Sequence, residues 1–347
     1  MKTDYLIVGQ GLAGTILGYE LLKAGRQCYF VDSPDYLKAS EVAAGLINPV
    51  VFRRMTKSWM VDEFYPLMSE TYRGMSEMLG EQFFIQMKML KVFGAGEEDL
   101  WQRKIFENKL EGYTSLAGNR RTFPLLDVPY GFGWVVNGGK LNIKRLLFLF
   151  KSFLDKNRLI SYENFEFDRL DVGRQKILYK DIEAGKIIFC EGHRGDQNPF
   201  FDKMKFKQAK GEILDLVIDN YRQDTVLNKS VFLMPVGEQR FRLGSTYSWD
   251  QLDERPTING RNELTGKLGQ FFQGNFSIEG HLAGIRPVLH DRRPVLGLHP
   301  DFQPVGIFNG LGAKGCIQAP YFAKMFVNFL LNKKKLILPE VNLSRYF

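Results

Sequence analysis

At 347 residues the chain is long enough for two domains with sizeable cores, and its 44% hydrophobic and 14% aromatic content excludes a disordered protein. The three cysteines, Cys28, Cys190 and Cys316, form neither a disulfide framework nor a metal-ligand spacing, which is typical of a reduced cytoplasmic protein without a metal site. The formal net charge of +8 leaves nucleic acid, acidic membrane surfaces and anionic substrates open as partners, whereas no apolar stretch approaches the roughly 20 residues of a bilayer span.

The first predicted element is a buried strand that runs into a glycine-rich turn. Apolar residues at 5–8 are followed by Gly-x-Gly-x-x-Gly, with its glycines at Gly9, Gly11 and Gly14, and by an apolar helical pattern over 15–24. Gly9 permits the tight turn, Gly11 lets the backbone approach a pyrophosphate, and Gly14 allows the helix to pack closely on the strand. The strand begins so near the start that we expect no leader. The pattern predicts a phosphate at the N-terminus of the helix.

The second predicted strand supplies an acidic residue. It covers 27–31 and ends at Asp32, which lies 18 residues after Gly14. A carboxylate about 20 residues after the glycines accepts a hydrogen bond from a ribose hydroxyl in dinucleotide-binding folds. The complete unit predicts a dinucleotide site, but the motif alone does not separate NAD from FAD. A glycine-rich turn without a ligand is the alternative.

Residues 38–49 form a stretch of small side chains that ends at a proline. Ser40 can cap a short helix, and its hydroxyl can reach a pyrophosphate. The small residues at 43–45 would let the backbone press against a flat ring. A tightly packed connection between two elements is the alternative interpretation.

The middle of the chain shows alternating helical and strand patterns. Apolar residues at helical spacing predict helices over 61–79, 97–109 and 141–156. Strands are predicted at 83–93, 122–123, 133–136 and 186–190, and 161–168 is expected to form a hairpin with 176–179. After Pro199, strands over 207–218, 229–234 and 239–247 predict an antiparallel sheet, and a helix is predicted over 261–272.

A second glycine-rich loop lies near the C-terminus. A strand at 306–309 leads into Gly310, Gly312 and Gly315, and an apolar helix follows over 316–331. Two such loops indicate a long ligand that the backbone approaches at two places. The N-terminus of the second helix, together with Lys314, would stabilise negative charge on a reduced flavin, which an NAD enzyme does not need. A turn that packs against the first loop is the alternative.

Taken together, these segments resemble the D-amino acid oxidase superfamily of FAD-dependent oxidoreductases. The superfamily includes glycine oxidase, sarcosine oxidase and the oxidase domain of the bifunctional enzyme that makes 5-methylaminomethyl-2-thiouridine in tRNA. The resemblance covers most of the chain, and the order and spacing of its motifs are more specific than any one of them. It rests on Gly9 to Gly14 with Asp32, Ala39-Ser40 to Pro49, Gly192, Lys210-Gly211-Glu212, Gly284-Ile285-Arg286-Pro287 with Asp291 and Pro294, and Asn309 to Pro320.

The resemblance implies an α/β fold with a discontinuous Rossmann-like FAD-binding domain (1–82, 137–205 and 282–347) and an inserted, mainly antiparallel α+β substrate domain (83–136 and 206–281). It implies FAD as the cofactor. The cofactor-binding residues that it implies are Gly9, Gly11, Leu12, Ala13, Gly14, Asp32, Ser40, Ala44, Gly45, Leu46, Asn48, Gly192, Asn309, Gly310, Leu311, Gly312, Ala313, Lys314 and Gly315. One departure is that Glu191 and His193 flank Gly192, where the family commonly has small residues.

The resemblance also implies catalytic residues. In the amino-acid oxidases of this family the arginine of Gly-x-Arg-Pro binds the substrate carboxylate, and here it maps to Arg286. A guanidinium pairs bidentately with a carboxylate, although an ion pair with Asp291 is the structural alternative. Tyr247, expected on the strand that starts at 239, is the second candidate, because its hydroxyl would orient the substrate. Cys316 is a conceivable site of covalent flavin attachment, but its place at a helix start favours a packed thiol.

The implied reaction is hydride transfer to flavin N5 from the carbon next to an amine, giving an imine that hydrolyses. The expected substrate is a small-molecule amine or amino acid. The alternative is a tRNA-modifying oxidase that removes a carboxymethyl group from a modified wobble uridine. The loop from Asn309 to Pro320 resembles that of the tRNA enzyme, and basic groups such as Arg120-Arg121 and Lys333 to Lys335 favour RNA, while the missing methyltransferase domain leaves the question open.

Overall fold

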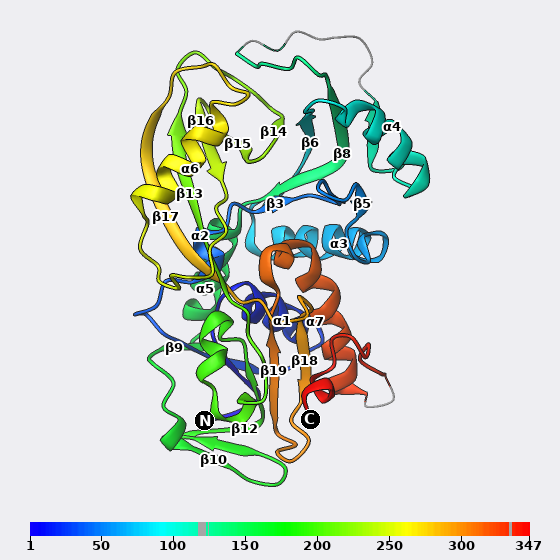
Figure 1. Cartoon of the computed structure of the whole chain (residues 1–347). Coiled ribbons are helices and arrows are strands. Elements are labelled where there is room, and N and C mark those ends of the chain that lie inside the picture. Colours follow the sequence, from blue (N-terminus) through cyan, green and yellow to red (C-terminus); the bar gives the residue numbers. More distant parts are fainter. Residues whose placement is uncertain (117–122, 124, 333–334) are drawn as a thin grey trace.

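The computed structural model describes residues 1–116, 123, 125–332 and 335–347 (Figure 1). Two β-sheets lie one above the other in this view, and both chain termini lie at the lower end. The middle of the view holds the helices α1 (Leu12–Lys23), α3 (Val61–Leu79), α5 (Ile143–Lys156) and α7 (Gly315–Leu331). Arg120, Arg121, Thr122, Lys333 and Lys334, which belong to predicted basic groups and a predicted strand, lie outside the described residues.

The lower sheet has a parallel centre. Its strands are β1 (Lys2–Val8), β2 (Cys28–Asp32), β9 (Ile160–Tyr162), β10 (Leu170–Val172), β11 (Ile177–Tyr179), β12 (Ile182–Phe189), β18 (Val295–Leu298) and β19 (Val305–Asn309). The order is β10-β11-β12-β1-β2-β9, and β19 pairs with the later part of β12 and with β18. β1 is parallel to both β12 and β2, so the carboxyl ends of these strands lie at one edge of the sheet. Ligands bind at that edge in open α/β sheets.

Close contacts between small and aromatic residues hold the helices against this sheet. Gly18 of α1 faces Phe30 of β2, because a Cβ at position 18 would lie 2.3 Å from the Phe30 Cζ. The Tyr72 hydroxyl of α3 donates a hydrogen bond of 2.6 Å to the carbonyl of Cys316 in α7. The first contact packs α1 against β2, and the hydrogen bond joins α3 to the first turn of α7. On the other face, Phe165 stacks on Tyr179 with ring centroids 4.4 Å apart.

The upper sheet is mainly antiparallel. Its strands are β3 (Leu46–Ile47), β6 (Phe84–Val92), β7 (Thr114–Leu116), β8 (Phe132–Leu141), β13 (Ala209–Val217), β14 (Val226–Asn228), β15 (Phe232–Gly237), β16 (Arg240–Gly244) and β17 (Ser277–Arg286). The order is β17-β13-β16-β15-β14-β6-β8-β3, with β7 paired to β8, and only the β14–β6 pair among these described strands is parallel. The remaining elements are α2 (Ala39–Val42), β4 (Val50–Val51), β5 (Thr56–Lys57), α4 (Glu97–Glu107) and α6 (Ile258–Leu268).

Mixed parallel and antiparallel sheets with packed helices confirm the predicted α/β class, but two predicted strand features are wrong. The 161–168 segment does not pair with 176–179: β9 pairs in parallel with β2, and the hairpin is β10 with β11. Periodicity shows that a segment is extended, but it does not show its partner. The strand predicted over 239–247 ends at Gly244, so Tyr247 lies beyond it. There the chain turns so that Ser248 can form an isolated bridge with Lys210.

The division into two domains stays a prediction. The lower sheet takes its strands from the segments 1–82, 137–205 and 282–347, and the upper sheet takes most of its strands from 83–136 and 206–281. Strand β3 pairs in the upper sheet although it lies in the predicted FAD-binding segment 1–82, and β8 and β17 cross the predicted boundaries after residues 136 and 281. Within the described ranges, no helix is both long enough and apolar enough to span a membrane.

Candidate active site

A cavity of about 540 Å³ lies at the carboxyl ends of β1, β2, β12 and β19 and reaches β13, β15 and β17 of the upper sheet. Of the predicted cofactor-binding residues, only Gly14 and Gly310 are outside its lining. Those that line it are Gly9, Gly11, Leu12, Ala13, Asp32, Ser40, Ala44, Gly45, Leu46, Asn48, Gly192, Asn309, Leu311, Gly312, Ala313, Lys314 and Gly315. Arg286 lines it as well, whereas Tyr247 does not.

The first glycine loop has a different steric reason for each glycine. Gly9 has a φ of +97°, and a Cβ there would lie 2.6 Å from the carbonyl oxygen of Cys190. A Cβ at Gly14 would lie 1.9 Å from the carbonyl oxygen of Gly9, so Gly14 serves the close packing of α1 on the turn. Gly11 differs, because its Cβ would meet only the Ser40 Oγ within 4 Å, at 3.5 Å. Gly11 therefore presents nearly bare backbone to the cavity.

Ser40 and Asp32 lie beside this loop. The Leu12 amide in the first turn of α1 donates a hydrogen bond of 3.1 Å to the Ser40 Oγ. Asp32 is 2% exposed, and its Oδ1 accepts a hydrogen bond of 2.8 Å from the Gln10 amide. Its Oδ2 lies 3.1 Å from the Lys38 Nζ and 3.4 Å from the Lys151 Nζ. The sequence predicts Asp32 but not its ion pair with Lys151, which is 119 residues away on α5.

The second glycine loop is tied to its neighbours by one side-chain and one backbone hydrogen bond. The Asn309 Nδ2 donates to the Gly192 carbonyl over 2.8 Å, and the Gly312 amide donates to the Pro287 carbonyl over 3.1 Å. Gly310 and Gly312 have φ values of +75° and +56°, which L side chains rarely adopt. Gly310 thus shapes the loop without lining the cavity.

The first turns of α1 and α7 lie side by side at the cavity. A Cβ at Gly315, the first residue of α7, would lie 3.1 Å from the Leu12 Cδ2 of α1. Two helix N-termini therefore direct their positive ends to one region. Bare backbone at Gly11, this double positive end and a buried carboxylate at Asp32 together fit the diphosphate and ribose of FAD.

Lys314 is a partly buried cation between the second loop and the segment before α3. Its Nζ donates to the Asn48 carbonyl over 3.2 Å and to the Ser58 Oγ. Burial lowers the pKa of Lys314 from 10.5 to about 8. No acidic side chain of the described residues forms an ion pair with it. Sequence analysis missed Ser58, which carries no motif and lies 256 residues from Lys314.

Arg286 ends β17, and oxygen atoms of the upper sheet hold its guanidinium. Nη1 donates to the Lys210 carbonyl over 3.2 Å, and Nη2 donates to the Ser245 Oγ over 2.9 Å and to the Thr246 carbonyl over 3.2 Å. The guanidinium lies flat against Gly211, where a Cβ would come within 2.0 Å of Nη2. Burial lowers the pKa of Arg286 from its ordinary value.

Arg286 forms no ion pair with Asp291, which was the structural alternative. The Asp291 Oδ2 instead lies 3.0 Å from the Arg345 Nε, and its Oδ1 accepts from the Arg293 amide over 3.0 Å. Within the described part of the chain, no other carboxylate pairs with Arg286 either. A cation that lines the cavity therefore has no counter-ion of its own.

Tyr247 lies outside the cavity lining and is 43% exposed. The Arg286 Cζ lies 4.8 Å from the centroid of its ring, and the ring packs edge-on against Trp249 at 4.9 Å. Its ring therefore contacts the guanidinium, while the predicted role of its hydroxyl stays a prediction. The exposure follows from the end of β16 at Gly244, three residues earlier.

Three further titratable groups line the cavity. Cys316 is buried in the first turn of α7, and burial raises the pKa of its thiol to about 12, so the thiol is neutral. Burial also raises the pKa of Glu191 to about 7, although its Oε2 accepts a hydrogen bond of 2.7 Å from the Asn198 Nδ2. Burial lowers the pKa of His193 to about 4, so its contact of 3.6 Å with Glu254 is not an ion pair at neutral pH.

Comparisons with known proteins agree with this geometry. The sequence pattern of the family described as FAD dependent oxidoreductase matches residues 4–328. Glycine oxidase of Bacillus subtilis (strain 168) is 21% identical, with 96% of this chain and 95% of the relative covered. Among solved structures, glycine oxidase from Bacillus cereus ATCC 14579 has a TM-score of 0.80 and 16% identity over 95% of each chain. Iminodiacetate oxidase from Chelativorans sp. BNC1 has a TM-score of 0.77 and 22% identity over 99% of this chain and 98% of that one.

Proposed function

Because the chain belongs to the FAD dependent oxidoreductase family and is an FAD-dependent oxidoreductase like glycine and amino acid oxidases, we propose that its substrate is a small amino acid or N-substituted amino acid. The bond oxidised is the one between the amine nitrogen and the adjacent carbon. The single observation that carries the proposal is Arg286, a cavity-lining cation without a carboxylate partner among the described residues.

The unpaired charge of the Arg286 guanidinium supports this proposal. A buried charge is stable only when it is paired and hydrogen-bonded, and Arg286 is hydrogen-bonded but not paired. A guanidinium has five N–H donors, of which three are used by Lys210, Ser245 and Thr246, so two remain. A substrate carboxylate would supply both the missing negative charge and the missing acceptors.

The names of the relatives support this substrate class. Glycine and iminodiacetate both carry a carboxylate next to an amine, and these are the substrates for which two of the similar proteins are named. We therefore infer that Arg286 binds the carboxylate and places the amine-bearing carbon toward the flavin.

The chain's own residues have defined tasks in this proposal. Bound FAD would supply the acceptor for a hydride from the carbon next to the amine, and water would hydrolyse the resulting imine. Arg286 orients the substrate by its carboxylate, and the backbone oxygens of Lys210 and Thr246 keep the guanidinium in place. Lys314 and the N-terminus of α7 place positive charge at the second loop. We assign no general base, because a neutral amine does not need one.

Anaerobic reduction of the bound flavin tests the proposal. We expect glycine, sarcosine, iminodiacetate or a D-amino acid to bleach the flavin absorbance of the purified protein, whereas the matching amine without a carboxylate reduces it much more slowly. Equal rates with an amino acid and its decarboxylated amine would contradict the role of the carboxylate.

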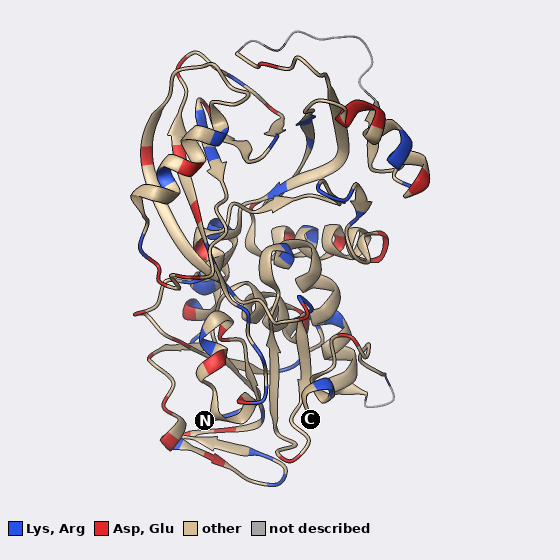
Figure 2. Ribbon diagram, viewed as in Figure 1, with Lys and Arg blue, Asp and Glu red and all other residues tan. Residues whose placement is uncertain are grey.

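Among the described residues, no structural observation specifically favours the tRNA-modifying alternative. In Figure 2, Lys and Arg alternate with Asp and Glu along the same helices and strands. The same assay separates the two hypotheses, because bleaching by tRNA that carries the modified uridine, and by none of the small molecules, would support the tRNA reaction.

A further inference from the structure

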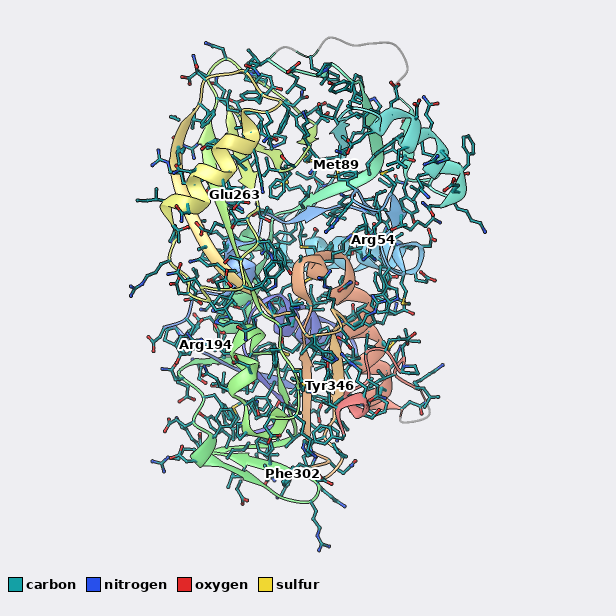
Figure 3. The ribbon with its side chains drawn as sticks, viewed as in Figure 1. Arg54, Met89, Arg194, Glu263, Phe302 and Tyr346 are labelled. Atoms are coloured by element: carbon teal, nitrogen blue, oxygen red, sulfur yellow. The ribbon has the colours of Figure 1, made fainter. Side chains whose placement is uncertain are left out.

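Arg194 and Tyr36 meet at the edge of the cavity. The Arg194 Cζ lies 3.4 Å from the centroid of the Tyr36 ring, so the guanidinium stacks on the ring, and both residues line the cavity. Arg194 lies on the left side of the view in Figure 3, between the regions labelled α5 and β9 in Figure 1. Neither residue belongs to the glycine motifs or to the predicted site.

The two residues come from opposite sides of the cavity. Tyr36 lies four residues after Asp32, which is at the end of β2 where the ribose is expected. Arg194 follows the turn at Glu191, whose Cα would lie 3.6 Å from a Cβ at Gly9. Arg194 therefore approaches from the diphosphate loop and Tyr36 from the ribose side.

Arg194 has a buried donor without an acceptor. Its Nε is buried and has no hydrogen-bond partner, and Arg194 forms no ion pair with any described residue. A buried donor that remains unpaired costs stability, so such groups in native proteins are satisfied by an ordered ligand or water. The donor belongs to a cavity-lining side chain in a region that fits a dianionic diphosphate.

We propose that Arg194 and Tyr36 bind the adenosine diphosphate half of FAD. The Arg194 guanidinium donates to an oxygen of the diphosphate, and the Tyr36 ring holds the guanidinium plane in position. A guanidinium suits phosphate because its planar donors match the phosphate oxygens, and stacking on an aromatic ring restricts its rotamers.

Binding of fragments of the cofactor tests the proposal independently of any substrate. The full chain, stripped of its cofactor, is titrated calorimetrically with ADP and, separately, with riboflavin, which lacks both phosphates and the adenosine. We expect Arg194→Ala to weaken ADP binding by roughly 10-fold or more, the effect of losing a charge-assisted hydrogen bond, and to leave riboflavin binding unchanged. The rate of FAD release from the loaded protein should rise in parallel.

Two further substitutions distinguish the role of the Tyr36 ring from that of its hydroxyl. Tyr36→Phe keeps the ring and should bind ADP like the unmodified chain, whereas Tyr36→Ala should weaken ADP binding by less than Arg194→Ala does. Arg174→Ala is the matched control, because Arg174 is an exposed arginine in the loop between β10 and β11. Thermal unfolding of each stripped variant checks that it folds.

Unchanged ADP affinity in Arg194→Ala would overturn the proposal, as would an equal loss of ADP and riboflavin affinity, which would show a general disturbance of the cavity. If Arg194→Ala does not fold, Tyr36→Ala is the test, because Tyr36 is already exposed. An unchanged ADP affinity in Tyr36→Ala then overturns the proposed contact of Arg194 and Tyr36 with the cofactor. Because no amine is used, failure here is distinct from failure of the proposed amino acid oxidation.

Discussion

The cavity balances charge differently at its two ends. At the end formed by β2, the Asp32 carboxylate has two ammonium partners, Lys38 and Lys151. At the end formed by β17 and α7, Arg286 and Lys314 have carbonyl and hydroxyl oxygens as partners but no carboxylate among the described residues. The carboxylate at the ribose end therefore has its counter-ions within the chain, whereas Arg286 and Lys314 at the opposite end are cations whose counter-ions must arrive with ligands. This difference predicts opposite responses to substitution.

Removal of the Asp32 carboxylate should have the largest effect on the stability of the cofactor-free chain. We expect Asp32→Ala to lower the unfolding free energy of the cofactor-free chain by about 2–3 kcal/mol, because it leaves the Lys38 and Lys151 ammonium groups without a partner. Urea denaturation measures the change. Equal stability of the variant and the unmodified chain would show that the ion pairs of Asp32 with Lys38 and Lys151 do not stabilise the fold.

Removal of an unpaired cation should instead change how stability depends on pH. The pKa of Lys314 is about 8 in the folded chain and 10.5 ordinarily, so the unfolded state binds more protons between these values. The unfolding free energy therefore rises with pH in that window, by about 1–2 kcal/mol after allowance for partial solvent exposure. Lys314→Met should remove this rise, and Lys144→Met, at an exposed position on α5, should keep it. A rise that persists in Lys314→Met contradicts the assignment.

Glu191 gives a smaller effect with the opposite sign. Its folded pKa of about 7 lies above the ordinary 4.5, so its protonated form contributes stability below pH 4.5 that is lost as the pH rises through about 7. Because the carboxyl is partly exposed, the loss should be on the order of 1 kcal/mol. We expect Glu191→Gln to flatten this dependence, as measured by urea denaturation over the same pH range. Exposed Glu111→Gln should leave the profile unchanged.

The smallest expected effect concerns Cys316. Since burial keeps its thiol neutral, with a pKa of about 12, we expect the flavin to be bound without a covalent bond. Acid precipitation should release all of the flavin into the supernatant, and Cys316→Ser should retain the flavin spectrum. Flavin that stays with the precipitated chain, and is lost from it in the variant, would contradict this expectation.

The motifs were predictable from sequence because each is local. One strand–turn–helix–strand unit contains the three positions that require glycine, Gly9, Gly11 and Gly14. The same unit contains the carboxylate of Asp32. The cavity lining includes these residues except Gly14, which packs the helix as its position in the motif predicts.

The partners of those residues were not predictable, because they depend on tertiary packing. Lys151 reaches Asp32 from α5, and Ser58 reaches Lys314 across 256 residues, with no spacing that would reveal either pair. The alternation of apolar and polar neighbours predicts a strand at Tyr247, but β16 ends at Gly244. Such alternation indicates an extended backbone, but it does not show where the pairing of strands ends.

The central element of the proposed function is Arg286 as the counter-ion of the substrate carboxylate. The decisive measurement is the rate of anaerobic flavin reduction by the preferred amino acid and by its decarboxylated amine, in the unmodified protein and in Arg286→Ala. Arg261→Ala, at an exposed position on α6, is the control. We predict that Arg286→Ala loses the preference for the amino acid by roughly 10- to 100-fold and that the control keeps it. A preference that survives in Arg286→Ala would contradict the account.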